Sequence, residues 1–278
     1  MSDTHEVYPN APLALVAVEV RFPQVSGART PPMPLQRAFR DLLGESWVIE
    51  SVKTQHVEFA FGPSGPGQQN VQQVVVPRFT VRDRTLAVAL TDESLTVETT
   101  GYRHYPDFRS VLERALGAAE ELLSPDGVAR AGMRYIDEVR VPDISDAASG
   151  SWKEWLDSSL LPPKLSSMIE EGFAPEGWEG AAQYATGPGR SLVLRYGVRS
   201  GYAVGPDGPL KRPTAPPSGP FFLLDFDSFW QPADIPEFSS EHLLKTCDEL
   251  RKPARTLFDL VVSDRLRDEV FRKEPSLG

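Results

Sequence analysis

The sequence predicts an α+β protein formed by tandem duplication of one unit, which runs strand, helix, antiparallel meander and long helix. Patterns typical of these elements occur in the same order in residues 1–127 and again in 128–278. Short turns join the strands of each meander, which favours antiparallel pairing. We therefore expect two α+β halves, each with a curved antiparallel sheet wrapped on a long helix. The two sheets are expected either as separate sheets or joined into one continuous sheet at 128–141.

The first half begins with an apolar run, 13–22, that is typical of a buried strand. A helix is predicted over 35–43, because apolar residues recur at helical spacing and Gly44 follows as a C-terminal cap. A second helix is predicted over 108–123, with Asp107 as its N-cap. Between the two helices, strands separated by tight turns or a Gly/Pro loop are expected at 47–61, 73–81, 85–90 and 95–100.

The second half opens with the stretch 128–141, which we expect at the centre of the fold. Its side chains alternate between two unlike faces, as they do in a strand. One face carries Met133, Tyr135, Asp137, Val139 and Val141, and the other carries Arg134, Ile136, Glu138 and Arg140. A sheet with two different sides is therefore expected here.

The remainder of the second half is predicted as a helix, three strands and a long helix. Ser151 and Glu154 match a capping box, so a helix is expected to begin there. The strands are expected at 178–186, 191–198 and 221–230. The last helix is expected to begin at Ser239 and to kink at Pro253, because proline removes one backbone hydrogen bond.

Composition limits the classes of function. The chain has 278 residues, a formal net charge of −10 and a pI near 5. An acidic surface without a run of Lys or Arg repels phosphate groups, so we expect neither nucleic acid nor a membrane as a partner. The N-terminal residues lack the basic and apolar regions of a signal peptide, and the apolar runs are too short to cross a bilayer. The expected location is the cytoplasm.

Asp225 and Asp227 are the clearest polar candidates for a functional site. They lie two residues apart in the predicted strand 221–230, so both carboxylates face the same side. Such a pair can bind a divalent metal or act as acid and base. The reading we favour is structural, because no further metal-ligand pattern accompanies them: either the outer face of this strand is solvated, or the aspartates pair with arginines of a neighbouring strand.

Three further residues are candidates for binding a ligand or a partner. Arg134 can meet a carboxylate or a phosphate through two parallel hydrogen bonds, and an ion pair with Asp225 or Asp227 is the simpler expectation. Tyr135 lies next to it in the same strand. His104 precedes a predicted helix, where it stands either at the mouth of a pocket or in a solvated turn.

The sequence carries no phosphate-binding loop, no dinucleotide-binding glycine pattern and no nucleophile elbow. Its four histidines have no metal-ligand spacing. We therefore expect no cofactor, no metal and no catalytic residue. The one cysteine, Cys247, lies on the apolar stripe of the last helix, which is typical of a buried structural thiol and not of a nucleophile.

Five segments, in order along nearly the whole chain, carry a resemblance to a known family. They are Tyr8–Leu13, Val18–Phe22, Gly132–Val139, Phe222–Asp227 and Leu257–Arg267. Together they resemble an uncharacterised, sporadically distributed bacterial protein family of about 250 residues with no assigned activity. The patchy occurrence of that family implies, by association, an accessory or defence-linked role.

These observations favour a non-enzymatic cytoplasmic binding protein that acts through a partner protein, as an accessory, immunity or neutralising factor. The alternative is a small-molecule-binding protein or enzyme that uses a cleft between the curved sheet and the long helix. Its expected lining is Arg134, Tyr135, Asp225 and Asp227.

Overall fold

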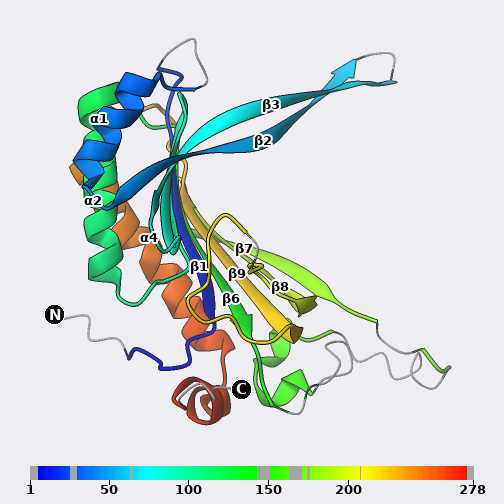
Figure 1. Ribbon diagram of the computed structural model, residues 1–278. Helices are drawn as coiled ribbons and strands as arrows, with labels where there is room; N and C mark the ends of the chain where they lie inside the picture. Colours follow the sequence, from blue (N-terminus) through cyan, green and yellow to red (C-terminus); the bar gives the residue numbers. More distant parts are fainter. Residues whose placement is uncertain are drawn as a thin grey trace.

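The computed structural model describes residues 6–25, 30–62, 65–142, 144, 151–162, 171–173, 176–206 and 208–273, and for 53–75 it describes the backbone. Within these residues, nine strands form one antiparallel sheet in the order β2-β3-β4-β5-β1-β6-β9-β8-β7 (Figure 1). The strands are β1 (Leu13–Arg21), β2 (Trp47–Gly62), β3 (Gly65–Val81), β4 (Leu86–Leu90), β5 (Ser94–Thr99), β6 (Arg130–Val139), β7 (Glu179–Gly187), β8 (Arg190–Gly201) and β9 (Gly219–Trp230).

Helices connect the strands and follow the last of them. They are α1 (Met33–Leu43), α2 (Tyr105–Leu123), α4 (Ser240–Val261) and α5 (Asp264–Leu266), with 3-10 turns at Trp152–Glu154 and Ser158–Leu160 and a π-helical turn at Arg267–Phe271. Among the described residues, none of these helices has the length and apolar character that crossing a membrane requires.

The protein is α+β, but the predicted arrangement of two curved sheets, each wrapped on a long helix, is wrong. β1 pairs with β5 on one side and with β6 on the other, so one sheet continues from β2 to β7. Pairing the first strands of the two halves fills the backbone hydrogen bonds that two separate sheets would leave open at their edges. The tandem duplication and the division at residue 127 stay predictions.

The three longer helices, α1, α2 and α4, lie together on one face of this sheet (Figure 1). The alternation of β1 shows why: Val16, Val18 and Val20 are 0–1% exposed and point to the helices, while the intervening residues point away. We call the opposite surface the open face. It carries Leu15, Ala17 and Glu19 of β1, Arg130, Arg134 and Ile136 of β6, Leu223, Asp225, Asp227 and Phe229 of β9, and Val193 and Arg195 of β8.

Two hydrophobic clusters fill the space between the sheet and the helices. The first joins β1, β4 and β5 to α1, α2 and the start of α4. The second joins β8 and β9 to the end of α4, with Trp152, Phe222 and Phe258 among its members. Burying each such side chain stabilises the fold by about 1.5–3 kcal/mol, so the helix face is fixed by packing.

Several local expectations need correction. The helix expected from Ser151 is only the turn Trp152–Glu154, and Ser151 makes no side-chain capping bond. Glu154 instead forms an ion pair with Arg265, and the tryptophan is 1% exposed in the second cluster. The strand predicted over 73–81 belongs to the longer β3, which forms with β2 a hairpin that extends well beyond the sheet (Figure 1).

Candidate functional site

β9 places Asp225 on the open face, where it is only 3% exposed. Nε and Nη2 of Arg134, on β6, each donate to one of its carboxylate oxygens at 2.7 Å. Nη1 of Arg195, on β8, lies 3.7 Å from Oδ2 of the same group. The hydrogen bond to Asp225 raises the pKa of Arg134, and burial opposes this rise. The buried carboxylate therefore holds two arginines whose side chains remain 47% and 50% exposed.

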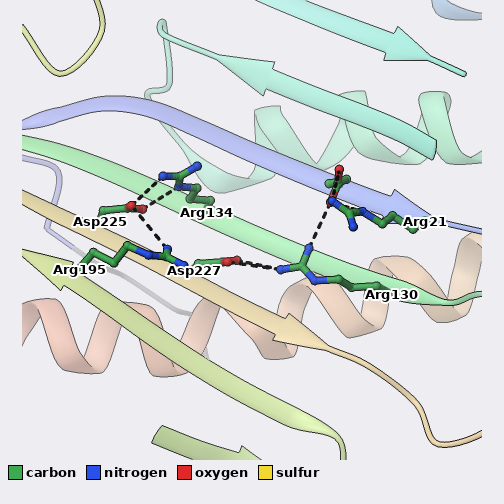
Figure 2. A network of polar contacts seen from close by, with 7 residues as sticks. Arg21, Arg130, Arg134, Arg195, Asp225 and Asp227 are labelled. Atoms are coloured by element: carbon green, nitrogen blue, oxygen red, sulfur yellow. Dashed lines mark hydrogen bonds and ion pairs between the residues drawn. The ribbon is translucent and has the colours of Figure 1, made fainter. Parts of the chain in front are cut away.

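Asp227 belongs to a second chain of contacts on the same face (Figure 2). Nη2 of Arg130 donates to both of its oxygens, at 3.2 and 3.3 Å, and Nη1 of Arg130 donates to Glu19 at 3.2 Å. Glu19 also accepts from Nε of Arg21 at 2.9 Å. The guanidinium of Arg130 stands 4.7 Å from the ring centroid of Phe229. Of the two structural alternatives, the pairing of both aspartates with arginines of a neighbouring strand is the one observed.

A groove of about 240 Å³ lies on the open face beside Asp225. Its charged lining residues are Arg134, Arg199 and Asp225, and Tyr202, Phe221 and Leu223 add aromatic and aliphatic surface. The groove therefore lies on the opposite side of the sheet from α4 and not between the sheet and that helix. It combines charged side chains of both signs with apolar surface, which is the usual composition of a binding site.

Glu138 holds the loop between β8 and β9 against the sheet at the edge of this groove. Its side chain is 0% exposed. Oε1 accepts from Nε of Arg140 at 2.8 Å, while Oε2 accepts from the backbone N–H of Ala203 at 2.7 Å and from Nη1 of Arg212 at 2.8 Å. Because Ala203 and the neighbouring Tyr202 line the groove, the buried carboxylate fixes one of its sides.

The structure separates the five predicted site residues into two groups. Arg134 and Asp225 meet in the groove, and Asp227 lies beside them on the same face. Tyr135 points to the opposite face of β6, toward the helices. His104 is an exposed residue at the N-terminus of α2, and its side chain makes no capping bond. Neither residue contributes to the groove.

The helix face of β6 places two titratable groups in the interior. The ring of Tyr135 packs edge-on against Tyr102 at a centroid distance of 6.4 Å, and burial raises the pKa of Tyr135 well above its usual value. Asp137 is 5% exposed between the two hydrophobic clusters. Burial raises the pKa of Asp137 to about 8, although the nearby positive charge of Arg255 opposes this rise. Asp137 is therefore a largely protonated acid at neutral pH and is not part of the groove.

Arg195, Arg199 and Tyr202 were not singled out from the sequence. The signal for the two arginines is that they lie four residues apart in β8, and an even spacing in a strand puts both on one face. Nothing local shows that β8 pairs with β9, which is what brings Arg195 to Asp225. Tyr202 follows the end of β8, where its position depends on the loop held by Glu138.

The arrangement favours anion binding over metal or acid–base chemistry. Asp225 and Asp227 are both occupied by arginines, so neither offers a free carboxylate to a metal or a substrate proton. Within the described part of the chain, no group of three or more His, Cys, Asp or Glu residues is placed to hold a metal ion. Exposed guanidinium groups held in fixed positions are instead suited to binding carboxylates or phosphates.

Comparison with known proteins does not assign the chain to a family: no family model matches it, and no curated protein matches its sequence. The resemblance to an uncharacterised bacterial family therefore stays a prediction.

Proposed function

We propose that this is a non-enzymatic binding protein that engages a partner protein through the open face of its sheet. The observation that carries the proposal is the set of two half-exposed arginines, Arg134 and Arg195, held by the buried carboxylate of Asp225. Arginine is enriched at the centres of protein interfaces. A guanidinium that is already fixed loses less conformational freedom on binding, so more of the contact energy appears as affinity.

The surroundings of these arginines support a protein partner. Leu15, Ile136, Val193 and Leu223 lie beside them on the open face and are only partly buried. An interface typically has apolar contacts at its centre with a few charged groups among them. Binding without chemistry is also how an accessory, immunity or neutralising factor would act, which fits the role implied by the family resemblance.

The specific observation that favours a second candidate is the groove of about 240 Å³. A small molecule held there would make the protein a carrier or sensor of that compound. This volume is below the range of roughly 300–1,000 Å³ typical of pockets for drug-sized ligands, so the partner protein is the better-supported reading.

Native mass spectrometry of the protein purified from its own host tests the proposal. The test variant is Arg195→Gln/Arg199→Gln, which removes two exposed cations from the groove region of the sheet. The matched control is Lys245→Gln/Lys252→Gln, which removes two exposed cations from α4. We expect a co-purified polypeptide with the wild type and the control but not with the test variant.

Three other outcomes would count against the proposal. A polypeptide that remains bound to the test variant would place the interface elsewhere. A bound mass of a few hundred daltons, lost in the test variant, would support the small-molecule candidate. A bare chain from all preparations would argue against a stable partner.

A further inference from the structure

The groove holds an excess of positive charge although the chain as a whole carries −10. Arg134, Arg195 and Arg199 lie in or beside it, with Asp225 as the buried carboxylate. Arg199 also pairs with Glu179, whose side chain is 72% exposed. Three guanidinium groups against two carboxylates leave one positive charge that no side chain of this group neutralises.

One part of the Arg134 guanidinium is used by neither Asp225 nor Glu179. Arg134 uses Nε and Nη2 for Asp225, and its Nη1 has no hydrogen-bond partner among the described residues. Asp225 keeps the guanidinium plane in place, so the remaining N–H groups are held ready for a second acceptor. Phe221 and Leu223 supply apolar surface in the same groove.

We propose that this groove receives an acidic side chain of the partner protein together with an apolar side chain beside it. The inference rests on the proposed function and adds the chemistry of the contact. The size agrees, because a groove of about 240 Å³ accommodates one or two side chains and not a folded element. The proposed partner is acidic where it meets the groove. The rest of this chain is also acidic and repels such a surface, so the positively charged groove is where the two proteins attract each other.

The charge balance favours a carboxylate over a phosphate. One carboxylate carries one negative charge, which matches the single excess positive charge of Arg134, Arg195 and Arg199 over Asp225 and Glu179. A phosphate monoester carries about −1.5 to −2 at neutral pH and would leave negative charge uncompensated beside Asp225. The apolar surface adds to this preference, because an uncompensated charge is costly to hold against it.

Phenylacetate is a suitable probe, because it joins one carboxylate to one apolar ring. The full chain, labelled with ¹⁵N, is titrated with phenylacetate while the arginine Nε–H signals are followed by NMR. Signals are assigned from single arginine variants. We expect saturable shifts of the Arg134 and Arg199 signals, with an apparent Kd in the millimolar range. Phenylacetamide, which has the same shape and no charge, is expected to cause no saturable shift.

Two variants separate groove binding from a general charge effect. Arg199→Gln removes a guanidinium of the groove, and we expect it to weaken phenylacetate binding about fivefold. Arg272→Gln is the matched control, because Arg272 is similarly exposed (44% against 41%) and also pairs with a glutamate, Glu6, outside the groove. The control is expected to bind phenylacetate as the wild type does.

Several results would overturn the inference. Equal binding of phenylacetamide would show that charge is not recognised, and tighter binding of phenyl phosphate would show that the anion is not a carboxylate. Absence of saturable shifts, or equal weakening by both variants, would remove the groove as a specific site. If the partner polypeptide is still lost from Arg195→Gln/Arg199→Gln in native mass spectrometry, the proposed function stands and only this inference fails.

Discussion

The guanidinium of Arg130 lies over the backbone of Gly132, two residues further along the same strand. A Cβ atom at position 132 would stand 2.5 Å from Nη1 of Arg130, closer than real atoms approach. Glycine is therefore what allows Arg130 to fold back along β6 and reach Glu19 on one neighbouring strand and Asp227 on the other. The two ion pairs of Arg130 therefore depend on the absence of a side chain at position 132.

Gly132→Ala is expected to displace Arg130 from both carboxylates. We expect it to lower the free energy of unfolding by about 1 kcal/mol, because partly exposed ion pairs contribute little each. In an Arg130→Gln background the same change is expected to be neutral or slightly stabilising, because alanine restricts the unfolded chain more than glycine does. Urea denaturation of the four proteins measures this coupling, and strictly additive effects would contradict it.

Asp137 is expected to make stability depend on pH. Its folded pKa of about 8 lies above that of an exposed aspartate, so the folded protein holds a proton that the unfolded chain releases. The contribution of Asp137 to the free energy of unfolding is therefore full at low pH. It is lost as pH rises from about 4 to about 8, by at most about 1.4 kcal/mol per pH unit. Asp137→Asn has no carboxyl group to ionise at this position. The free energy of unfolding of the variant, relative to that of the wild type, should therefore rise with pH across that window.

Urea denaturation at pH 5 and pH 8 measures that difference. Asp157→Asn is the control, because a hydrogen bond from Ser159 lowers the pKa of Asp157 and its titration falls below the window. A difference between wild type and Asp137→Asn that stays constant with pH would show that Asp137 is ionised in the folded protein.

Glu138→Gln is expected to release the loop between β8 and β9. The change leaves the guanidinium groups of Arg140 and Arg212 without their charged partner in a buried position, which typically costs about 3–5 kcal/mol. Trypsin should then cleave after Lys211 faster than in the wild type, because the Arg212–Pro213 bond itself resists trypsin. Glu179→Gln removes a 72% exposed glutamate that is also paired with an arginine, and it should cost less than about 1 kcal/mol. Equal stability of the two variants would contradict the anchoring role of Glu138.

Cys247 is expected to react with thiol reagents only when the protein opens. The residue is fully buried, and burial raises the pKa of its thiol to about 12. At pH 8 the reactive thiolate is therefore scarce as well as shielded. Labelling by a chromogenic disulfide should be slow in buffer and fast in concentrated urea, where the unfolded chain serves as the control. Fast labelling of the native protein would show local opening at α4.

Interactions within one segment were predictable from the sequence. The alternation of 128–141 correctly placed Arg134 and Glu138 on one face of β6 and Met133 on the other, because side chains in any strand alternate. The same rule put Asp225 and Asp227 on one side of β9. The helical spacing around Cys247 correctly predicted a buried thiol.

Local rules failed where a distant contact competed with them. Ser151 and Glu154 have the spacing of a capping box, but Glu154 pairs with Arg265, which lies more than one hundred residues away in sequence. Burial of Trp152 in the second cluster fixes the same segment as a short turn. Packing of a large aromatic side chain outweighs a cap that contributes about 1 kcal/mol.

Sequence patterns predicted the type of most elements, the two faces of the central strands and the polar residues that those faces carry. The pairing of β1 with β6, which makes one sheet, and of β8 with β9, which brings Arg195 to Asp225, followed from the folded structure alone. The physical reason is that alternation is a property of each strand, whereas pairing depends on which backbone edges and side chains meet across the sheet. The candidate site is built from such pairings.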